Sequence, residues 1–214
     1  MQVVSTNLGE KKTVNWKGKK VETGIYKQPV EGAIYLGAYG VQKDQVVDLK
    51  VHGGIDKSCY LYSEDHYSYW KEVYSQLGWN WGMFGENLTV SGLDESKIYI
   101  GDIYEVGDAH IQVSQPRQPC YKLGIRFGDQ KILKDFIKSG FSGAYVRVIK
   151  EGLVKKGDTL KLIIRSRSGL PVSEIFRMLY DKRTDRDQIE NAIYDGNLSN
   201  SVKRELAGKL NRIT

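Results

Sequence analysis

The fold is indicated most clearly by residues 98–114, which read Ile98-Tyr-Ile-Gly-Asp-Ile-Tyr-Glu-Val-Gly-Asp-Ala-His-Ile-Gln-Val-Ser114. Apolar or β-branched residues alternate with polar ones in two runs, Ile98 to Val106 and His110 to Ser114, and glycine separates the runs. The same texture recurs in Val21 to Ile25, Ala33 to Leu36, Lys57 to Tyr62, Ala144 to Ile149 and Thr159 to Ile164. Many short strands separated by turns predict a β-barrel or β-sandwich.

Two longer segments interrupt these strands with apolar residues at helical spacing. Residues Glu64 to Leu77 place aromatic and aliphatic side chains three and four positions apart, with Ser63 as the predicted N-cap. Residues Asp129 to Ser139 repeat the pattern, with Asp129 near the start of the helix. The chain is therefore predicted to be mainly β with added helices.

The sequence pattern changes after Pro171, because the alternation of β-branched and polar residues stops. From there to the end, apolar residues recur at helical spacing. The predicted helices are Ser173 to Tyr180, Asp187 to Tyr194 and Ser199 to Leu210, with Ser173, Asp185 and Ser199 as caps. We therefore place a domain boundary near residue 168, giving domains at 1–167 and 168–214. The basic residues of this three-helix unit form either a contact surface or an ordinary solvated face; they are Arg177, Lys182, Arg183 and Arg186.

Composition narrows the functional classes. The chain has 214 residues, of which 40% are hydrophobic and 27% charged, as in a soluble globular protein. It has no run of eighteen apolar residues and does not begin like a secretory signal, so we expect a cytoplasmic protein with no membrane contact. The net charge of +6 is spread evenly along the chain, so an anionic small molecule fits it as well as nucleic acid does, and no stable nucleic-acid complex is expected. Two cysteines are expected to stay reduced.

The most informative motif is Ser114-Gln-Pro-Arg-Gln-Pro-Cys-Tyr-Lys-Leu-Gly-Ile-Arg126. Pro116 and Pro119 restrict the backbone before Cys120 and hold its thiol in a defined direction. Arg117, together with a helical turn starting at Tyr121, favours the thiolate, which is a metal ligand or a nucleophile. The alternative is that Cys120 is a small buried apolar residue.

Three further glycine turns each lead into a strand and carry polar side chains. In residues 51–62, Gly53 and Gly54 allow an anion-binding turn beside His52 and Lys57, although each polar residue there is also explained as a structural one. Residues 83–90 carry Glu86 and Asn87, which orient a ligand or close the turn. Arg147 lies within a predicted buried strand and requires an anion, either a ligand or an acidic residue of the protein.

Taken in order, six elements resemble the MOSC family, the molybdenum cofactor sulfurase C-terminal domain. They are Thr23-Gly-Ile-Tyr-Lys-Gln-Pro-Val30, His52-Gly-Gly-Ile-Asp-Lys57, Phe84-Gly-Glu-Asn-Leu-Thr89, Ile100-Gly-Asp102, Gln115-Pro-Arg-Gln-Pro-Cys120 and Ser142-Gly-Ala-Tyr-Val-Arg147. The resemblance is strongest to the bacterial branch linked to resistance to N-hydroxylated purines. This chain departs from many relatives at Lys43-Asp44, where they have Gly-Asp, at Ser58-Cys59 and at Ala144.

The resemblance implies a β-barrel of the pyruvate-kinase-insert type, followed by a small C-terminal three-helix domain. It also implies a molybdenum-pterin cofactor (molybdopterin), with Cys120 as the metal ligand and catalytic residue. The matching candidates for binding the cofactor are Lys27, His52, Lys57, Asn87, Arg117 and Arg147. Cys59 is expected to be a strand residue without a ligand role.

The implied activity is an oxidoreductase that reduces N-hydroxylated compounds, such as N-hydroxylaminopurines, and thereby detoxifies them. The chain has no Gly-x-Gly-x-x-Gly turn opening a helix and too few cysteines for an iron–sulfur cluster, so a separate flavoprotein electron donor is expected. One alternative is a non-catalytic carrier of the molybdenum cofactor or of sulfur. Another is a cysteine-dependent phosphatase, because Cys120 and Arg126 have the Cys-x5-Arg spacing, although Tyr121, Leu123 and Ile125 are poor residues for such a loop.

Overall fold

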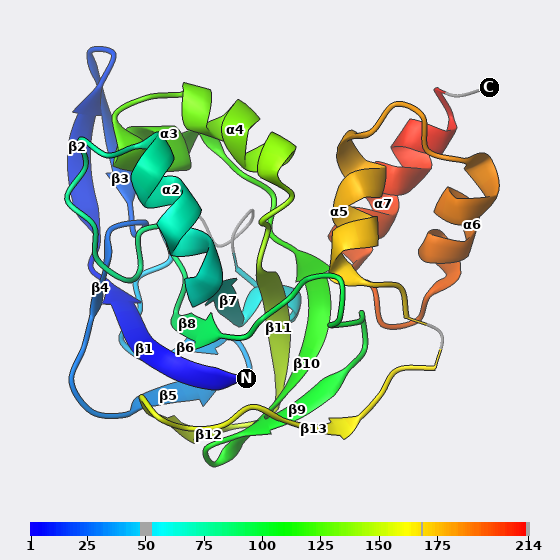
Figure 1. The fold of residues 1–214 in the computed structure, drawn as a ribbon, viewed down its shortest axis with the longest axis horizontal. Coiled ribbons are helices and arrows are strands. Elements are labelled where there is room, and N and C mark those ends of the chain that lie inside the picture. Colours follow the sequence, from blue (N-terminus) through cyan, green and yellow to red (C-terminus); the bar gives the residue numbers. More distant parts are fainter. Residues whose placement is uncertain (48–52, 168, 213–214) are drawn as a thin grey trace.

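The computed structural model describes residues 1–47, 53–167 and 169–212. The strands are β1 (Gln2–Gly9), β2 (Lys12–Trp16), β3 (Lys19–Thr23), β4 (Lys27–Pro29), β5 (Ile34–Gly37), β6 (Gly40–Val41), β7 (Cys59–Ser63), β8 (Leu88–Ser91), β9 (Ile103–Val106), β10 (Ala109–Pro116), β11 (Ala144–Lys150), β12 (Gly152–Val154) and β13 (Lys161–Ile164). The helices are α2 (Tyr67–Val73), α3 (Tyr121–Phe127), α4 (Lys131–Ser139), α5 (Val172–Tyr180), α6 (Arg186–Tyr194) and α7 (Asn200–Leu210), with 3-10 turns η1 (Ile55–Lys57) and η2 (Glu64–His66). The fold is mixed α/β and mostly sheet (Figure 1).

The main sheet has eight strands in the order β13-β9-β10-β11-β7-β8-β1-β4. Neighbours are antiparallel except β7 and β8, which are parallel. No ladder joins β13 to β4 within the described residues, so the expected closed barrel is not seen. Sequence alternation identifies strands but not closure, because closure depends on strand tilt and stagger rather than on which face is apolar.

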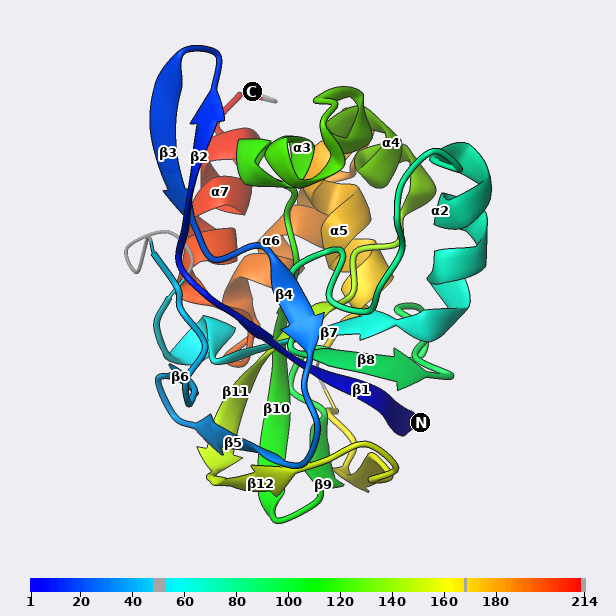
Figure 2. The ribbon, with the colours of Figure 1, turned by 90° about the vertical axis from the view of Figure 1, so that its left-hand side faces the viewer.

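Two small sheets complete the β structure. Strands β12, β5 and β6 pair in that order beside the main sheet. Strands β2 and β3 pair only with each other and project from the body as a hairpin (Figure 2). The predicted strand runs correspond to β3, β5, β7, β9, β10, β11 and β13, with shifts of a few residues at their ends.

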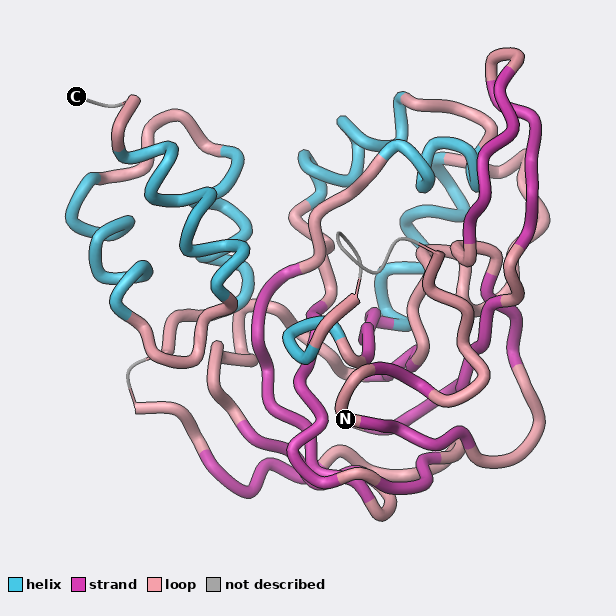
Figure 3. The backbone as a smooth tube through the Cα atoms, turned by 180° about the vertical axis from the view of Figure 1, so that it is seen from behind, coloured by secondary structure: helices cyan, strands magenta, loops and turns pink. Residues whose placement is uncertain are grey.

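The helices lie in two groups, seen from behind in Figure 3. Helices α2, α3 and α4 pack with β7 around a buried aromatic cluster that includes Tyr62, Trp70, Phe84 and Phe136. Helices α5, α6 and α7 stand beside β10 and contribute Ile175, among others, to the same buried cluster as the sheet. Residues 98–100 are hydrogen-bonded to the segment where α5 begins. Ile100 N donates to the Leu170 carbonyl at 2.9 Å, and Val172 N donates to the Ile98 carbonyl at 3.0 Å.

The helical predictions are confirmed in position and corrected in their ends. The predicted helix at 64–77 is divided into the 3-10 turn η2 and the helix α2, and it ends earlier than predicted, at Val73. The Ser63 side chain makes no cap bond. Asp185 and Ser199 cap α6 and α7, as predicted. Ser173 does not cap α5, because the helix begins one residue earlier, after Pro171. The division into two domains at residue 168 stays a prediction.

Across residues 1–47, 53–167 and 169–212, no helix has the length and apolar character needed to cross a membrane.

Candidate functional site

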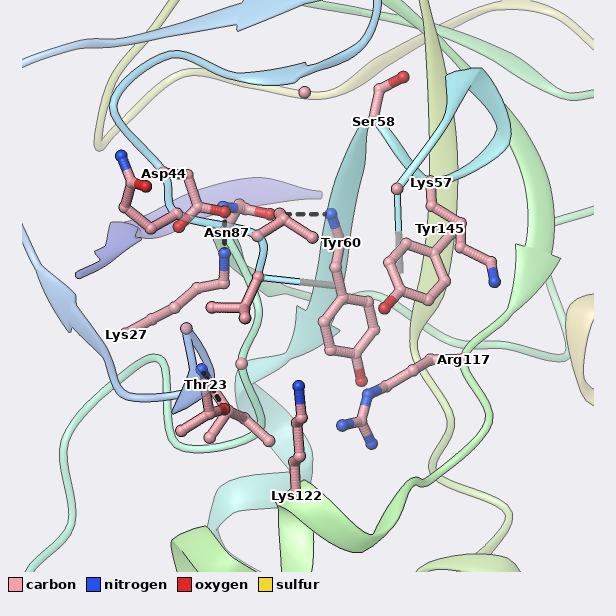
Figure 4. Close-up of a pocket in the computed structure, with 18 of the residues that line it drawn as sticks. Thr23, Lys27, Asp44, Lys57, Ser58, Tyr60, Asn87, Arg117, Lys122 and Tyr145 are labelled. Carbon is pink, nitrogen blue, oxygen red and sulfur yellow. Dashed lines mark hydrogen bonds and ion pairs between the residues drawn. The ribbon is translucent and has the colours of Figure 1, made fainter. Parts of the chain in front are cut away.

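Most of the predicted site residues meet at one cavity. Five parts of the chain converge on it: the β3–β4 segment, the loop before η1, strand β7, the 84–87 turn and the start of α3 (Figure 4). The residues that line it are Thr23, Gly24, Ile25, Lys27, Tyr39, Gly40, Asp44, Gln45, Val46, Val47, Gly53, Lys57, Ser58, Tyr60, Phe84, Gly85, Asn87, Arg117, Cys120, Lys122 and Tyr145. Five of the seven predicted site residues are therefore brought together: Lys27, Lys57, Asn87, Arg117 and Cys120.

Cys120 lies between strand β10 and helix α3. It is the residue directly before α3, with φ −120° and ψ 164°, so it is extended and its carbonyl accepts the first helical bond, from Leu123 N at 2.8 Å. Its thiol is in no disulfide, and its side chain is partly exposed at the cavity. The predicted helix from Tyr121 is confirmed, and the strand end at Pro116 fixes the other side of the loop.

Arg117 is the most unusual residue of the site, because it is 5% exposed and one of its guanidinium nitrogens, Nη1, has no hydrogen-bond partner. The guanidinium lies over the rings of Tyr60 and Phe136, at 5.4 Å and 5.3 Å from their centroids. Burial raises the pKa of the neighbouring Tyr145 phenol, although the Arg117 charge opposes that rise. A buried cation with an unused donor is costly unless an anion binds there.

The opposite wall of the cavity is a buried network around Asp44, a residue that the sequence analysis did not select. The Asp44 carboxylate pairs with the Lys27 ammonium and accepts bonds from Asn87 Nδ2 at 3.0 Å and from Gly9 N at 2.8 Å. Lys27 is therefore partly neutralised within the protein. Gly24 has to be glycine here, because a Cβ would lie 1.7 Å from the Gln45 carbonyl oxygen.

The turn that contains η1 places Lys57 at the cavity. Burial lowers the pKa of the Lys57 ammonium, and the nearby Asp56 and Glu205 carboxylates oppose that shift. His52, predicted in the same turn, lies outside the described residues.

Arg147 is not among the residues that line the cavity. Its guanidinium donates to Asp56 Oδ1 at 2.6 Å, to Gln112 Oε1 at 3.1 Å and to the Asn197 carbonyl at 2.8 Å. These contacts correspond to the acidic partner within the protein that the sequence analysis left open. Arg147 therefore holds the turn that carries Lys57, and the geometry does not favour a direct contact with a ligand.

Glu86, which the sequence left as either a ligand contact or a turn residue, closes its turn. Its buried carboxylate accepts bonds from Gly82 N at 2.8 Å, Phe84 N at 3.1 Å and Thr89 Oγ1 at 2.9 Å. Cys59 is fully buried at the start of β7 and does not line the cavity.

Sequence reasoning missed several lining residues, including Lys122, Tyr60 and Tyr145. Lys122 lies two residues after Cys120, and Figure 4 shows its ammonium directed into the cavity. Tyr60 and Tyr145 are neighbours on paired strands, β7 and β11, with ring centroids 5.0 Å apart. Only the strand pairing shows that they meet, so no local signal could have selected them.

The polar side chains of the cavity fit an anionic ligand that itself supplies most of the ligands of a bound metal. Three cationic side chains, Arg117, Lys57 and Lys122, line the cavity together with one thiol, Cys120. In the described part of the chain, no group of three or more His, Cys, Asp or Glu residues could hold a metal ion. A metal here would thus take Cys120 as its protein ligand, with further ligands from a bound organic group.

Comparison with known proteins places these residues within a family model. The model of the MOSC domain matches residues 48–161, which include Lys57, Asn87, Arg117 and Cys120. The chain is 39% identical over 211 residues to the Bacillus subtilis (strain 168) protein YflK, described as uncharacterized, across 99% of this chain and 95% of that protein.

Two further similarities extend the comparison. The crystal structure of YiiM from Geobacillus stearothermophilus superimposes with a TM-score of 0.82 and 33% sequence identity, covering 98% of each chain. A Gibberella moniliformis (strain M3125 / FGSC 7600) protein named "Reductase" is 34% identical over 170 residues. That match covers 76% of this chain but 29% of the longer fungal protein.

Proposed function

The chain belongs to the MOSC-domain family, and from this we propose that it binds a molybdenum-pterin cofactor in the cavity beside Cys120 and reduces N-hydroxylated compounds to amines. The substrates we propose are N-hydroxylated bases such as N-hydroxylated purines. This assignment follows the bacterial MOSC branch that the sequence resembles.

The single observation that carries the proposal is the buried Arg117 guanidinium, whose Nη1 has no hydrogen-bond partner, at the cavity that Cys120 also lines. Leaving a buried donor unsatisfied costs free energy that a bound anion would recover, and Arg117, Lys57 and Lys122 together supply positive charge around the cavity. The phosphate of a pterin cofactor satisfies these cations, while Cys120 supplies the soft thiolate that the metal requires. Asn87 adds an amide, but its Nδ2 already donates to Asp44.

The reaction breaks an N–O bond and consumes two electrons and two protons: R–NH–OH becomes R–NH2, and the oxygen leaves as water. When bound, the cofactor supplies the two-electron redox chemistry. The protein holds that group through Cys120, binds its anionic part through Arg117 and Lys57, and keeps the reaction in a partly closed cavity. The ammonium of Lys122 points into the cavity, and in this proposal it donates a proton to the departing hydroxyl oxygen.

Electrons come from a separate flavoprotein in this proposal. Support for a reductase comes from the fungal relative named "Reductase", of which this chain matches only a part.

Two other functions use the same cavity. A carrier of the molybdenum cofactor or of sulfur binds without turnover, so it shares the binding residues and lacks the reduction. The phosphatase alternative is disfavoured, because residues 121–127 form helix α3 rather than an open phosphate-binding loop, and Arg126 is not among the residues that line the cavity.

The test measures molybdenum in protein expressed with molybdate in a host that makes the pterin cofactor. We expect near-stoichiometric metal in the wild type and its loss in Cys120→Ala. Cys59→Ala is the matched control, because Cys59 is buried and is not among the residues that line the cavity, and that variant is expected to keep its metal. The loaded wild type is then assayed with an N-hydroxylated purine and reduced methyl viologen as electron donor.

The outcomes separate the candidates. Metal and turnover that both depend on Cys120 support the reductase, whereas metal without turnover favours the carrier. Absence of metal from the wild type, even after incubation with isolated cofactor, contradicts the proposal. Release of phosphate from a generic aryl phosphate, dependent on Cys120, would favour the phosphatase.

A further inference from the structure

The hairpin of β2 and β3 is an exposed and basic feature of the described chain. It carries five lysines, Lys11, Lys12, Lys17, Lys19 and Lys20, against two glutamates between residues 10 and 23, and all five lysines are exposed. The strands pair over their full length, from Lys12 opposite Thr23 to Trp16 opposite Lys19. Lys17 and Gly18, with φ of 50° and 76°, form the two-residue turn that suits the twist of a hairpin.

One face of this hairpin combines charge with apolar surface. Residues directly opposite each other share a face, so Val14, Val21 and Trp16 lie together with Lys12 and Lys19. The side chains of Val14, Trp16 and Val21 are partly exposed. An aromatic and aliphatic centre bordered by cations is typical of a protein-binding surface.

The base of the hairpin leads directly to the candidate site. Thr23, the last residue of β3, and the following Gly24 and Ile25 line the cavity. The Lys12 ammonium lies 5.5 Å from the centroid of the Tyr26 ring, and the Tyr26 hydroxyl donates to the Ile125 carbonyl of α3 at 3.4 Å. The hairpin therefore adjoins both the rim of the cavity and the helix that begins after Cys120.

We infer that the β2–β3 hairpin is the docking arm for an acidic flavoprotein electron donor. The inference rests on the proposed reductase function, because that reaction requires two electrons from outside the chain. Because the base of the hairpin adjoins residues 23–25 at the cavity, a partner held by the hairpin brings its flavin toward the cavity. Charge complementarity selects an acidic partner, and the apolar face around Trp16 gives it a contact that salt does not screen.

Nucleic acid is the other polyanion that a basic hairpin attracts. Two features favour a protein. Glu22 lies among the lysines and pairs with Lys11 at 2.7 Å, which reduces the attraction for a phosphate backbone. Val14 and Val21 at the centre of one face offer little to phosphates, whereas they suit a protein surface.

The test uses the holoenzyme with flavodoxin, a small acidic flavoprotein, reduced by its NADPH-dependent reductase. The variant is Lys19→Glu with Lys20→Glu. Lys155→Glu with Lys156→Glu is the control, because it makes the same change in net charge at exposed positions in the β12–β13 loop, at the other end of the molecule. Flavodoxin-driven and viologen-driven rates are compared, and flavodoxin binding is measured separately through quenching of flavin fluorescence.

We expect Lys19→Glu/Lys20→Glu to raise the KM and the Kd for flavodoxin about tenfold at low ionic strength, with the viologen-driven rate unchanged. The control pair is expected to change neither constant by more than about twofold. Equal effects of the two pairs, or no rate with flavodoxin, overturn the docking inference while the viologen rate upholds the reductase. No rate with viologen contradicts the reductase itself, and the binding titration then decides whether the hairpin still holds flavodoxin. If a single-stranded oligonucleotide binds more tightly than flavodoxin and this binding is lost in Lys19→Glu/Lys20→Glu, the hairpin binds nucleic acid and the docking inference is wrong.

Discussion

Lys57 links the chemistry of the cavity to pH. Burial lowers the pKa of its ammonium below the ordinary lysine value of 10.5, so Lys57 loses its charge at a lower pH than an exposed lysine does. If Lys57 binds an anion, affinity is highest below this lowered pKa and declines as the pH rises through it. We expect the Kd for inorganic pyrophosphate, a probe for the cofactor phosphate, to increase with pH within the alkaline range below 10.5, as Lys57 loses its proton.

Two substitutions test this assignment. Lys57→Arg keeps its charge throughout that range, so the alkaline loss of affinity is expected to shift upward or disappear. Lys57→Met is expected to weaken binding about tenfold at pH 7, because a charge-assisted contact is lost. Isothermal titration at several pH values measures both effects. If the wild type and Lys57→Arg had the same pH profile, Lys57 would not be the anion-binding group.

Lys43 occupies a backbone conformation that favours glycine, with φ of 68°. The next residue, Asp44, is the buried carboxylate that pairs with Lys27. We expect Lys43→Gly to raise the free energy of unfolding by about 1 kcal/mol, because the left-handed strain of a non-glycine residue is removed.

The control for Lys43→Gly is its neighbour Gln42, whose φ is not positive. Gln42→Gly is expected to lower the free energy of unfolding by about 0.5 kcal/mol, because glycine adds freedom to the unfolded chain without relieving strain. Urea unfolding measures both changes. A loss of stability in Lys43→Gly would show that the lysine side chain contributes more than the backbone strain costs.

At the level of single residues, sequence reasoning identified the part of the site that is carried by local motifs. Cys120, Arg117, Lys57 and Asn87 lie in turns whose glycines, prolines and charges are visible along the chain, and all four line the cavity. Tyr145 lies within a strand and is brought to the cavity by long-range pairing. Such contacts depend on register, which composition does not specify.

The three C-terminal helices differ in how they begin, and this makes a prediction at the level of the element. The Asp185 carboxylate accepts from Asp187 N at 2.7 Å, and the Ser199 hydroxyl accepts from Val202 N at 3.3 Å. Asp185→Ala and Ser199→Ala are each expected to cost about 1 kcal/mol of stability. Ser173→Ala, inside α5, is expected to cost almost nothing, because Ser173 makes no cap bond and alanine favours helix.

Chemical denaturation followed by circular dichroism compares these three variants. Ser173→Ala serves as the internal control, since it removes the same hydroxyl from a neighbouring helix. A cost for Ser173→Ala equal to that of Ser199→Ala would contradict the cap assignment. The sequence placed these helices to within about two residues because helical spacing and caps are local. It did not predict the open edges of the sheet, since those depend on how eight strands meet.

At the scale of the whole molecule, the sequence pattern near residue 168 changes from strands to helices. The buried core nevertheless includes residues on both sides of that position. Ile175 of α5 is 1% exposed and belongs to the same apolar cluster as Ile98, Ile100 and Val113 of the sheet region. Ser199 N also donates to the Ser114 carbonyl, at 3.2 Å, close to the loop of Cys120. We therefore expect the helices and the sheet to unfold together.

Ile175→Ala tests this coupling, because removing a buried isoleucine side chain costs about 3 kcal/mol. All four tryptophans precede residue 82, so tryptophan fluorescence reports on residues outside the C-terminal helices, while hydrogen exchange of the α6 and α7 amides reports on those helices. In Ile175→Ala, the unfolding transitions reported by both probes are expected to move together to a lower urea concentration. In Tyr194→Ala, whose side chain is 84% exposed, both transitions are expected to stay unchanged. A tryptophan transition that stays in place while the helices loosen would instead mean that residues 168–214 fold as an independent domain, and the Cys120 loop would then keep its geometry without them.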